Sequence, residues 1–451
     1  MPTLDQIVPV TVTRQTVYPT LPGFGTPGLM AVHSYWADRI RTFQQLSELT
    51  EAGVSVNHPI YKWCTAVFSQ NPRPTKVAIV KRLLPFTQTI TLTPQSAVEG
   101  DVYTFTVANG SGVSTDITRT VPSSSTLSAE GTAIAALIDA ALGADGDAAS
   151  VSGVITITMD AGVTCRLSNL PTLSKMLVAE TTTDPGIGTD FAAALNAEQE
   201  NADLSFFSVD LDCAGKLTVV ALAALVEATK KILVVQTSDT ACATSATTDV
   251  MSTIKASAYS QTAIIFAQYT NADYRSGAWA GKLLPYTPGT ATWAHKTLSG
   301  IHADKLRSSE ADYITGKYGT TYQTVASTNL TYQGQVGDGD FLDNITGSFE
   351  LEQACQLAVL GGFTTNLKIP YTDFGLQSVR SLLEGVVEAR IAKGPGSLNF
   401  LASDPAPTVF VPAAANVSPA DKAARIINGI VITAKIAGAI HRAPIQINLS
   451  V

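Results

Sequence analysis

The chain is poor in histidine and cysteine, and both shortages argue against metal and disulfide chemistry. It has five histidines among 451 residues. Two of them, His295 and His302, lie close in sequence but form no HExxH pattern, so no zinc site is expected. The cysteines are odd in number, widely spaced and never form a CxxC pair, which is typical of isolated buried thiols in a protein made in a reducing cytoplasm. They are Cys64, Cys165, Cys213, Cys242 and Cys355. We expect neither a bound metal nor a cofactor.

Clusters of basic residues and long hydrophobic runs are also missing. The formal net charge is -8 at pH 7, and without a basic patch no nucleic-acid partner is expected. The most apolar stretch, Leu217–Leu225, has about half the length that spans a bilayer. Met1–Thr20 carries Asp5 before any basic residue and has no continuous apolar core. We therefore expect neither a signal peptide nor direct membrane insertion.

Two glycine-rich loops imitate nucleotide-binding motifs and depart from them where the chemistry is strict. Gly23–Gly28 fits GxGxxG, but Pro22 precedes it and Pro27 lies inside it, so the strand and helix that frame a dinucleotide loop are not expected. Gly277–Lys282 has one residue too few between its glycines for a phosphate loop, and Leu283 replaces the magnesium-binding Ser or Thr. We interpret both as structural segments.

A third motif, the acidic run Asp338, Asp340 and Asp343, suggests a calcium loop. It lacks the glycine and the terminal glutamate of such a loop, so a solvated acidic turn before a helix is the better interpretation. No GxSxG elbow is present, and no catalytic residue is predicted. A triad of distant residues leaves no sequence signature because triads are defined by geometry. A cytoplasmic α/β enzyme therefore stays an alternative.

Residues 86–183 differ in composition from the rest of the chain. They hold 29 Ser or Thr in 98 positions, no tryptophan, and nine acids against three bases. A single core stops growing near about 250–300 residues, so several domains are expected. We predict that 86–183 is an inserted, acidic, β-rich outer domain. Strands are predicted around Tyr103–Val107 and Ile155–Met159, where apolar residues alternate with threonine, and an alanine-rich helix over Gly131–Leu142.

The parts that flank the insert have an α/β pattern. Short apolar runs at Lys76–Lys81, Leu204–Val209 and Ile232–Val235 predict buried strands, and Ala221–Lys230 and Asp249–Ser257 predict helices between or after them. The fold class is thus α/β and α+β multidomain. Three parts are predicted: a middle α/β domain of 25–85 with 184–334, the insert of 86–183, and a core domain of 1–24 with 335–451.

The C-terminal segment of the third part, 335–451, is predicted to begin with two helices. Ser348 can cap a helix that Gly361 and Gly362 end, and a second amphipathic helix starts near Asp373 and stops at Lys393–Pro395.

Both ends of the chain alternate between apolar and polar residues, as strands do. The alternating apolar positions are Val8, Val10 and Val12 at one end and Ile445, Ile447, Leu449 and Val451 at the other. Terminal strands fray unless a sheet holds them. They pair either within their own domain or with a neighbouring subunit by β-augmentation.

Several stretches together resemble the contractile tail sheath proteins of bacteriophages, as a divergent branch. Ala66–Pro74 (AVFSQNPRP) leads into Val77–Arg82 as at the junction where these proteins insert an outer domain. Gly281–Pro285 with Ala294–Ile301 is similar to the segment that closes their middle domain. Their C-terminal domain is similar to Phe341–Phe363, Ile369–Phe374 and the helix after Gly375. Asn71–Pro74 stands where many sheath proteins carry a glycine pair.

The resemblance implies a structural protein and no enzyme. It implies hexameric rings, stacked as a helix around a tail tube in the virion, that contract to drive the tube through the host envelope for genome ejection. The implied partners are further copies, the tube protein, and baseplate and tail terminator proteins, with assembly in the host cytoplasm. The terminal strands would exchange between subunits. Four basic residues against one acid, Asp421, form a possible tube-facing surface: Lys422, Arg425, Lys435 and Arg442. Another tail or baseplate component is the alternative.

Overall fold

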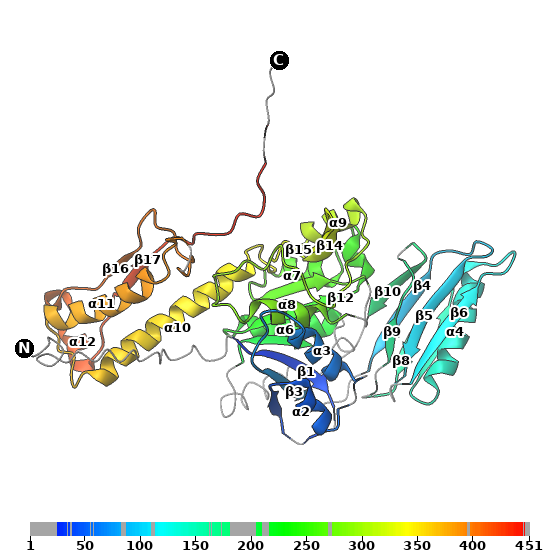
Figure 1. The fold of residues 1–451 in the computed structure, drawn as a ribbon, viewed down its shortest axis with the longest axis horizontal. Helices are drawn as coiled ribbons and strands as arrows, with labels where there is room; N and C mark the ends of the chain where they lie inside the picture. Colours follow the sequence, from blue (N-terminus) through cyan, green and yellow to red (C-terminus); the bar gives the residue numbers. More distant parts are fainter. Residues whose placement is uncertain are drawn as a thin grey trace, which may run out of the picture.

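The protein has a mixed α/β fold with several separate sheets (Figure 1), as the computed structural model shows. The structure describes residues 25–444 and 446, except 34, 37, 55, 57, 83–86, 110–112, 162, 164, 173, 181–203, 210–215, 269–272 and 395–396. In this part of the chain no helix is long and apolar enough to cross a membrane.

The largest sheet has six strands in the order β13-β12-β11-β1-β3-β2. The strands are β1 (Pro27–Val32), β2 (Ile40–Phe43), β3 (Val77–Arg82), β11 (Phe206–Val209), β12 (Ile232–Thr237) and β13 (Thr262–Phe266). All neighbours run parallel except β2 and β3. The three apolar runs predicted as buried strands are β3, β11 and β12, so these predictions are confirmed. Both faces of a parallel sheet are covered, which is why its strands are almost continuously apolar.

Helices cover both faces of this sheet. They are α2 (Leu46–Glu51), α3 (Pro59–Phe68), α6 (Lys216–Glu227), α7 (Val250–Ala256) and α8 (Arg275–Leu283). Because successive strand residues point to opposite faces, Met30 packs with α6 and α7, while Leu29 packs with Trp63 of α3. On that second face α8 adds Trp279. The helix predicted over Asp249–Ser257 is α7, with Asp249 as its N-cap.

Two short elements extend the sheet beyond β13. Thr320, just before β14 (Thr321–Val325), accepts a hydrogen bond from the Phe266 N–H at 2.8 Å. β14 pairs antiparallel with β15 (Thr328–Tyr332), and α9 (Ser308–Gly316) and the 3-10 helix η2 (Thr240–Ala243) lie near. An opening lies at this edge of the sheet, between α9 and the β14–β15 hairpin.

The segment after β3 forms a unit with its own core. Its elements are β4 (Thr89–Pro94), β5 (Val102–Ala108), β6 (Ser114–Thr120), α4 (Leu127–Leu142), β7 (Gly146–Val151), β8 (Val154–Met159), β9 (Arg166–Ser168) and β10 (Met176–Glu180). They form the sheets β10-β4-β8-β7 and β6-β5-β9 with α4 packed on them. Tyr103, Phe105, Ile155 and Ile157 are fully buried, so the two predicted strands and the helix are confirmed.

Strands from both sides of this unit lie in the six-stranded sheet, since β1 pairs with β3 on one side and β11 on the other. The residue boundaries drawn between the three domains stay a prediction.

The C-terminal part contains α10 (Leu342–Thr365), α11 (Asp373–Glu388), β16 (Thr408–Phe410), the 3-10 helix η3 (Ala414–Asn416), α12 (Pro419–Ala424) and β17 (Val431–Thr433). In Figure 1, α10 reaches from the central sheet to α11 and α12 at the far end. The second predicted helix is confirmed as α11.

The predicted start and end of α10 were wrong. Ser348 does not cap the helix but lies inside it, with its hydroxyl donating to the Asn344 carbonyl at 2.8 Å. Gly361 and Gly362 continue the helix rather than end it. A Cβ on Gly362 would lie 2.4 Å from Leu382 Cδ1, so this glycine serves close packing of α10 on α11.

Candidate functional site

The two loops that imitate nucleotide motifs have structural roles. Gly25 lies in a turn, and Pro27 begins β1, so the chain continues as a strand and not as the helix of a dinucleotide site. Gly23 and Phe24 lie outside the described residues. The second motif forms part of α8, where a Cβ on Gly277 would lie 2.8 Å from Trp63 Nε1 and one on Gly281 2.8 Å from the Val67 carbonyl oxygen. These glycines let α8 pack directly on α3.

The acidic run before α10 is an ordered turn. Asp338 accepts from the Asp340 N–H at 2.9 Å, and Asp340 accepts from the Phe341 N–H at 2.7 Å. Asp343 is buried in the first turn of α10, and burial raises its pKa to about 6, with nearby Asp340 adding to the shift and Lys296 opposing it. No group of three or more potential metal ligands occurs among the described residues.

The histidines are distributed over separate structural positions. His33 is buried against Trp36, with ring centroids 4.0 Å apart, and burial together with the charge of Lys81 lowers its pKa to about 4. His58 caps α3 through Nδ1, and His302 contacts Asp273, with 2.9 Å between Nδ1 and Oδ1. His295 lies elsewhere, beside His441.

The cysteines within the described residues are free thiols. Cys64, Cys165 and Cys242 are buried, and Cys355 is half-buried; Cys213 lies outside the described residues. Burial raises the pKa of the Cys64, Cys242 and Cys355 thiols. A raised pKa lowers the thiolate fraction, so none of these three is set up as a nucleophile.

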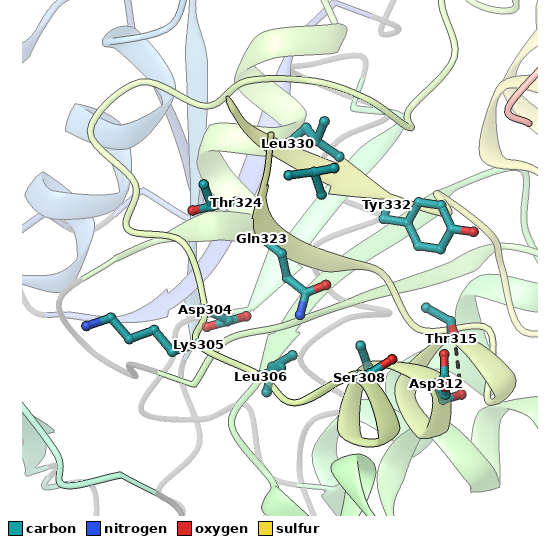
Figure 2. A pocket seen from close by; sticks show the side chains of 12 residues that line it. Asp304, Lys305, Leu306, Ser308, Asp312, Thr315, Gln323, Thr324, Leu330 and Tyr332 are labelled. Atoms are coloured by element: carbon teal, nitrogen blue, oxygen red, sulfur yellow. Dashed lines mark hydrogen bonds between the residues drawn. The ribbon is translucent and has the colours of Figure 1, made fainter. Parts of the chain in front are cut away.

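An opening of about 560 Å³ lies between α9 and the β14–β15 hairpin (Figure 2). Figure 2 places Lys305 and Asp312 at opposite ends of it. The carboxylate of Asp304 accepts from the Arg275 guanidinium, with 2.5 Å between Nη1 and Oδ2, and both side chains are fully buried. Arg275 therefore holds Asp304 in the core, and the other ionisable residues of the lining are Lys305, Asp312 and Tyr332.

The C-terminal part contains a different kind of feature, a sheet of only two strands. β16 and β17 pair antiparallel over three residues each, and no other described strand pairs with either outer edge. On one face Val409 and Ile432 pack against α11 and its neighbours. On the other, Phe410 and Val431 are exposed. Two short strands are marginally stable by themselves, and open edges accept further strands.

A groove of about 490 Å³ runs between α11 and β16. Val387, Ile391 and Val409 form its apolar floor. Arg380 and Glu384 lie at its rim and form an ion pair, with 2.8 Å between Nε and Oε1. An apolar floor beside an open strand edge is suited to an extended segment with alternating apolar residues.

Large apolar side chains are also exposed where α10 ends and α11 begins. They belong to Leu360, Phe363, Leu367 and Phe374, with the Leu367 side chain fully exposed. Apolar groups gathered at one end of a domain mark an interaction surface.

The predicted strand-exchange residues lie outside the described part of the chain: Val8, Val10, Val12, Ile445, Ile447, Leu449 and Val451. The four basic residues predicted to face a tube are described, and all are exposed. Lys422 lies in α12 and Arg425 follows it in the left-handed conformation. Lys435 follows β17, and Arg442 lies in the segment beyond it.

No protein-family profile matches the chain, and no curated protein matches it in sequence. Among solved structures, the contracted helical sheath of the anti-feeding prophage is similar over 98% of this chain and 99% of that chain, at 10% identity and a TM-score of 0.48. The sheath tail protein of Desulfitobacterium hafniense is similar over 89% of this chain and 93% of that chain, at 12% identity and a TM-score of 0.42. Both of these structures are of sheath proteins. A baseplate structure of the anti-feeding prophage is similar over 58% of this chain and 72% of that chain, at 14% identity and a TM-score of 0.41.

Sequence reasoning missed β16 and β17. The signal was present, because Val409 and Val411 alternate with Phe410, and Ile430 and Ile432 alternate with Val431. Each run is only three or four residues long, and both faces carry apolar residues, which hides the period of two.

Proposed function

We propose that the chain is a structural subunit of a phage contractile tail sheath. Copies form hexameric rings that stack around the tail tube and contract to drive it through the host envelope. The observation that carries this proposal is the two-stranded β16–β17 sheet beside an apolar groove, to whose outer edges no further strand of the described residues is added. A sheet of this size is completed most simply by strands from other copies.

The ends of the chain are the natural source of those strands. The alternation at Val8–Val12 and Ile445–Val451 is the pattern that an open edge with an apolar floor accepts. An arm that binds a neighbour's sheet, while its own sheet receives another arm, makes a head-to-tail contact. Such contacts do not close on themselves and generate helical filaments.

Contraction is then a rearrangement of rigid bodies. The central sheet and the C-terminal part each have their own apolar core, and the 24-residue α10 connects them. A buried ion pair between Arg390 and Glu350, with 2.7 Å between Nε and Oε2, fixes α10 to the end of α11. Backbone pairing in the arms holds neighbours together while contacts between domains are exchanged.

Further partners follow from charge and position. We propose that Lys422, Arg425, Lys435 and Arg442 face the tube, and that the acidic insert faces outward, where like charge disfavours sideways aggregation. Baseplate and tail terminator proteins bind the two ends of the sheath. The protein is thus part of the phage tail in the virion and is assembled in the host cytoplasm.

The test is removal of the C-terminal arm. Deleting Ile445–Val451 is expected to abolish polymerisation and leave a soluble monomer, as seen by negative-stain microscopy and size exclusion. A finer version places Asp at Ile447 and Leu449, on the apolar face of the predicted strand. The matched control places Asp at Asn448 and Ser450, on its polar face, and is expected to polymerise. Ordered sheaths from the truncated chain would refute the proposal.

The same experiment distinguishes the sheath subunit from two alternative functions. Another tail or baseplate component would form small rings or discrete complexes rather than long cylinders. A cytoplasmic α/β enzyme would stay a small oligomer with turnover, whether or not the arm is present.

A further inference from the structure

The segment that follows β17 returns from the C-terminal part toward the central sheet (Figure 1). Within 437–444 every residue is exposed except His441, and the preceding Ile440 is 89% exposed. Among these residues His441 is the one side chain that is not exposed, and it contacts the central part of its own subunit.

Three groups from two elements form the receptor for this side chain. The Thr292 hydroxyl lies 2.7 Å from His441 Nε2. Phe341, the residue before α10, meets the imidazole edge-on, with ring centroids 4.7 Å apart at 88°. The ring of His295 lies 5.6 Å away at 34°.

The receptor is held in place by the sheet behind it. His295 donates its N–H to the Thr331 carbonyl of β15 at 2.7 Å, and the Thr331 hydroxyl donates to the Trp293 carbonyl at 3.0 Å. Trp293 is buried in the core beneath. A rigid receptor means that docking or release of His441 changes the path of the tail and leaves the body unchanged.

The charged and titratable groups around His441 come from every element packed there. The 292–296 loop supplies His295 and Lys296, β15 supplies Tyr332 beside His295, and the tail itself supplies Arg442. On the α10 side Asp340 accepts from the Phe341 N–H and from Asn344, and buried Asp343 acts on Lys296. Neither acid is among the groups that shift the pKa of His441, which are His295 and Lys296.

We propose that the docked His441 is a pH-sensitive latch that sets the direction of the C-terminal tail and opens when the imidazole is protonated. Protonation would place a cation between His295 and Lys296 in a partly buried site. The hydrogen bond to Thr292 does not by itself decide the outcome, because a hydroxyl can donate or accept. Charge repulsion and lost hydration decide it.

The direction of the pH effect follows from the same contacts. Burial first, and then the charges of His295 and Lys296, lower the pKa of docked His441 below its ordinary value. When the docked form has the lower pKa, protons favour the released form. The latch is then at full strength above the ordinary histidine pKa of about 6.5 and weakens as the pH falls below it. At one pH unit below that value, the ratio of released to docked tail is up to about tenfold higher than at a pH where His441 is neutral in both states.

The docking inference stands on the single chain; only its consequence, an arm that is re-aimed by pH, rests on the proposed sheath function. It is tested in the purified full-length chain with 4-fluorophenylalanine in place of Phe341, whose fluorine shift senses the imidazole. His441→Ala supplies the shift of the released state. Between pH 7.5 and 5.5 the native chain is expected to move toward this reference, with the released-to-docked ratio rising by up to about tenfold.

Two variants separate a titrating latch from a general pH effect. His441→Gln keeps a polar side chain that does not titrate. Its fluorine shift is expected to change between pH 7.5 and 5.5 only as much as that of His441→Ala, in which nearby Asp343 still titrates. His302→Gln removes a histidine whose ring lies on Asp273, and it is expected to behave as the native chain. A native shift that does not move, a pH response in His441→Gln as large as the native one, or equal shifts in His441→Ala and the native chain at pH 7.5 would each overturn the latch. Sheath formation is measured separately by microscopy. Failure of the latch and failure of the proposed sheath function can therefore be told apart.

Discussion

Replacing Gly281 by alanine tests how α8 packs on α3. The new Cβ would lie 2.8 Å from the Val67 carbonyl oxygen and 2.9 Å from Val67 Cα, so two backbones must separate. Alanine gains about 0.5–1 kcal/mol of helix preference over glycine. Overpacking a core costs about 1–3 kcal/mol. We expect Gly281→Ala to lower the free energy of unfolding by about 1–2 kcal/mol. The control is Gly316→Ala at the end of α9, where nothing lies within 4 Å of the added Cβ and no loss is expected.

The assay is urea unfolding followed by tryptophan fluorescence. All four tryptophans lie around the six-stranded sheet: Trp36, Trp63, Trp279 and Trp293. The signal therefore reports this domain and not the insert or the C-terminal part, which matters because multidomain chains need not unfold in one step. If Gly281→Ala unfolds at the same urea concentration as Gly316→Ala, the close-packing account of this glycine is wrong.

Two further predictions use the same assay. Arg275→Met leaves the buried Asp304 carboxylate without its cation and is expected to cost about 3–5 kcal/mol, most of which the double variant with Asp304→Leu should recover, because an apolar pair replaces an ion pair well. No recovery would contradict this. Asp343 has its pKa raised from 3.8 to about 6, so its charge destabilises the fold increasingly as the pH rises from 4 to 6. Asp343→Asn should therefore add about 2–3 kcal/mol at pH 8 and little near pH 4, and an equal gain at both pH values would refute the electrostatic cause.

The elements that could be predicted are those with a strong local pattern. The strands β5 and β8 were predicted because tyrosine, phenylalanine and isoleucine alternate with threonine on a half-buried sheet. The helix α11 was predicted from apolar residues at three- and four-residue steps. The limits of α10 were not predicted, because Gly361 and Gly362 are locally typical of a helix end, whereas in the structure the helix continues through both and Gly362 lies against Leu382 of α11. Packing overrides propensity where two helices touch.

The amino-acid sequence by itself determined several buried strands, among them β3, β11 and β12, the apolar face of α11, and the different composition of 86–183. These properties depend on side-chain periodicity over a few residues, and that is local information. Only the tertiary structure decided that β1 and β11 are neighbours in one sheet, and that Arg275 and Asp304 form a fully buried ion pair. The same is true of β16 and β17, and of His441 in its receptor. Such contacts join residues far apart in the chain, and their free energy comes from desolvation and packing that exist only once the chain has folded.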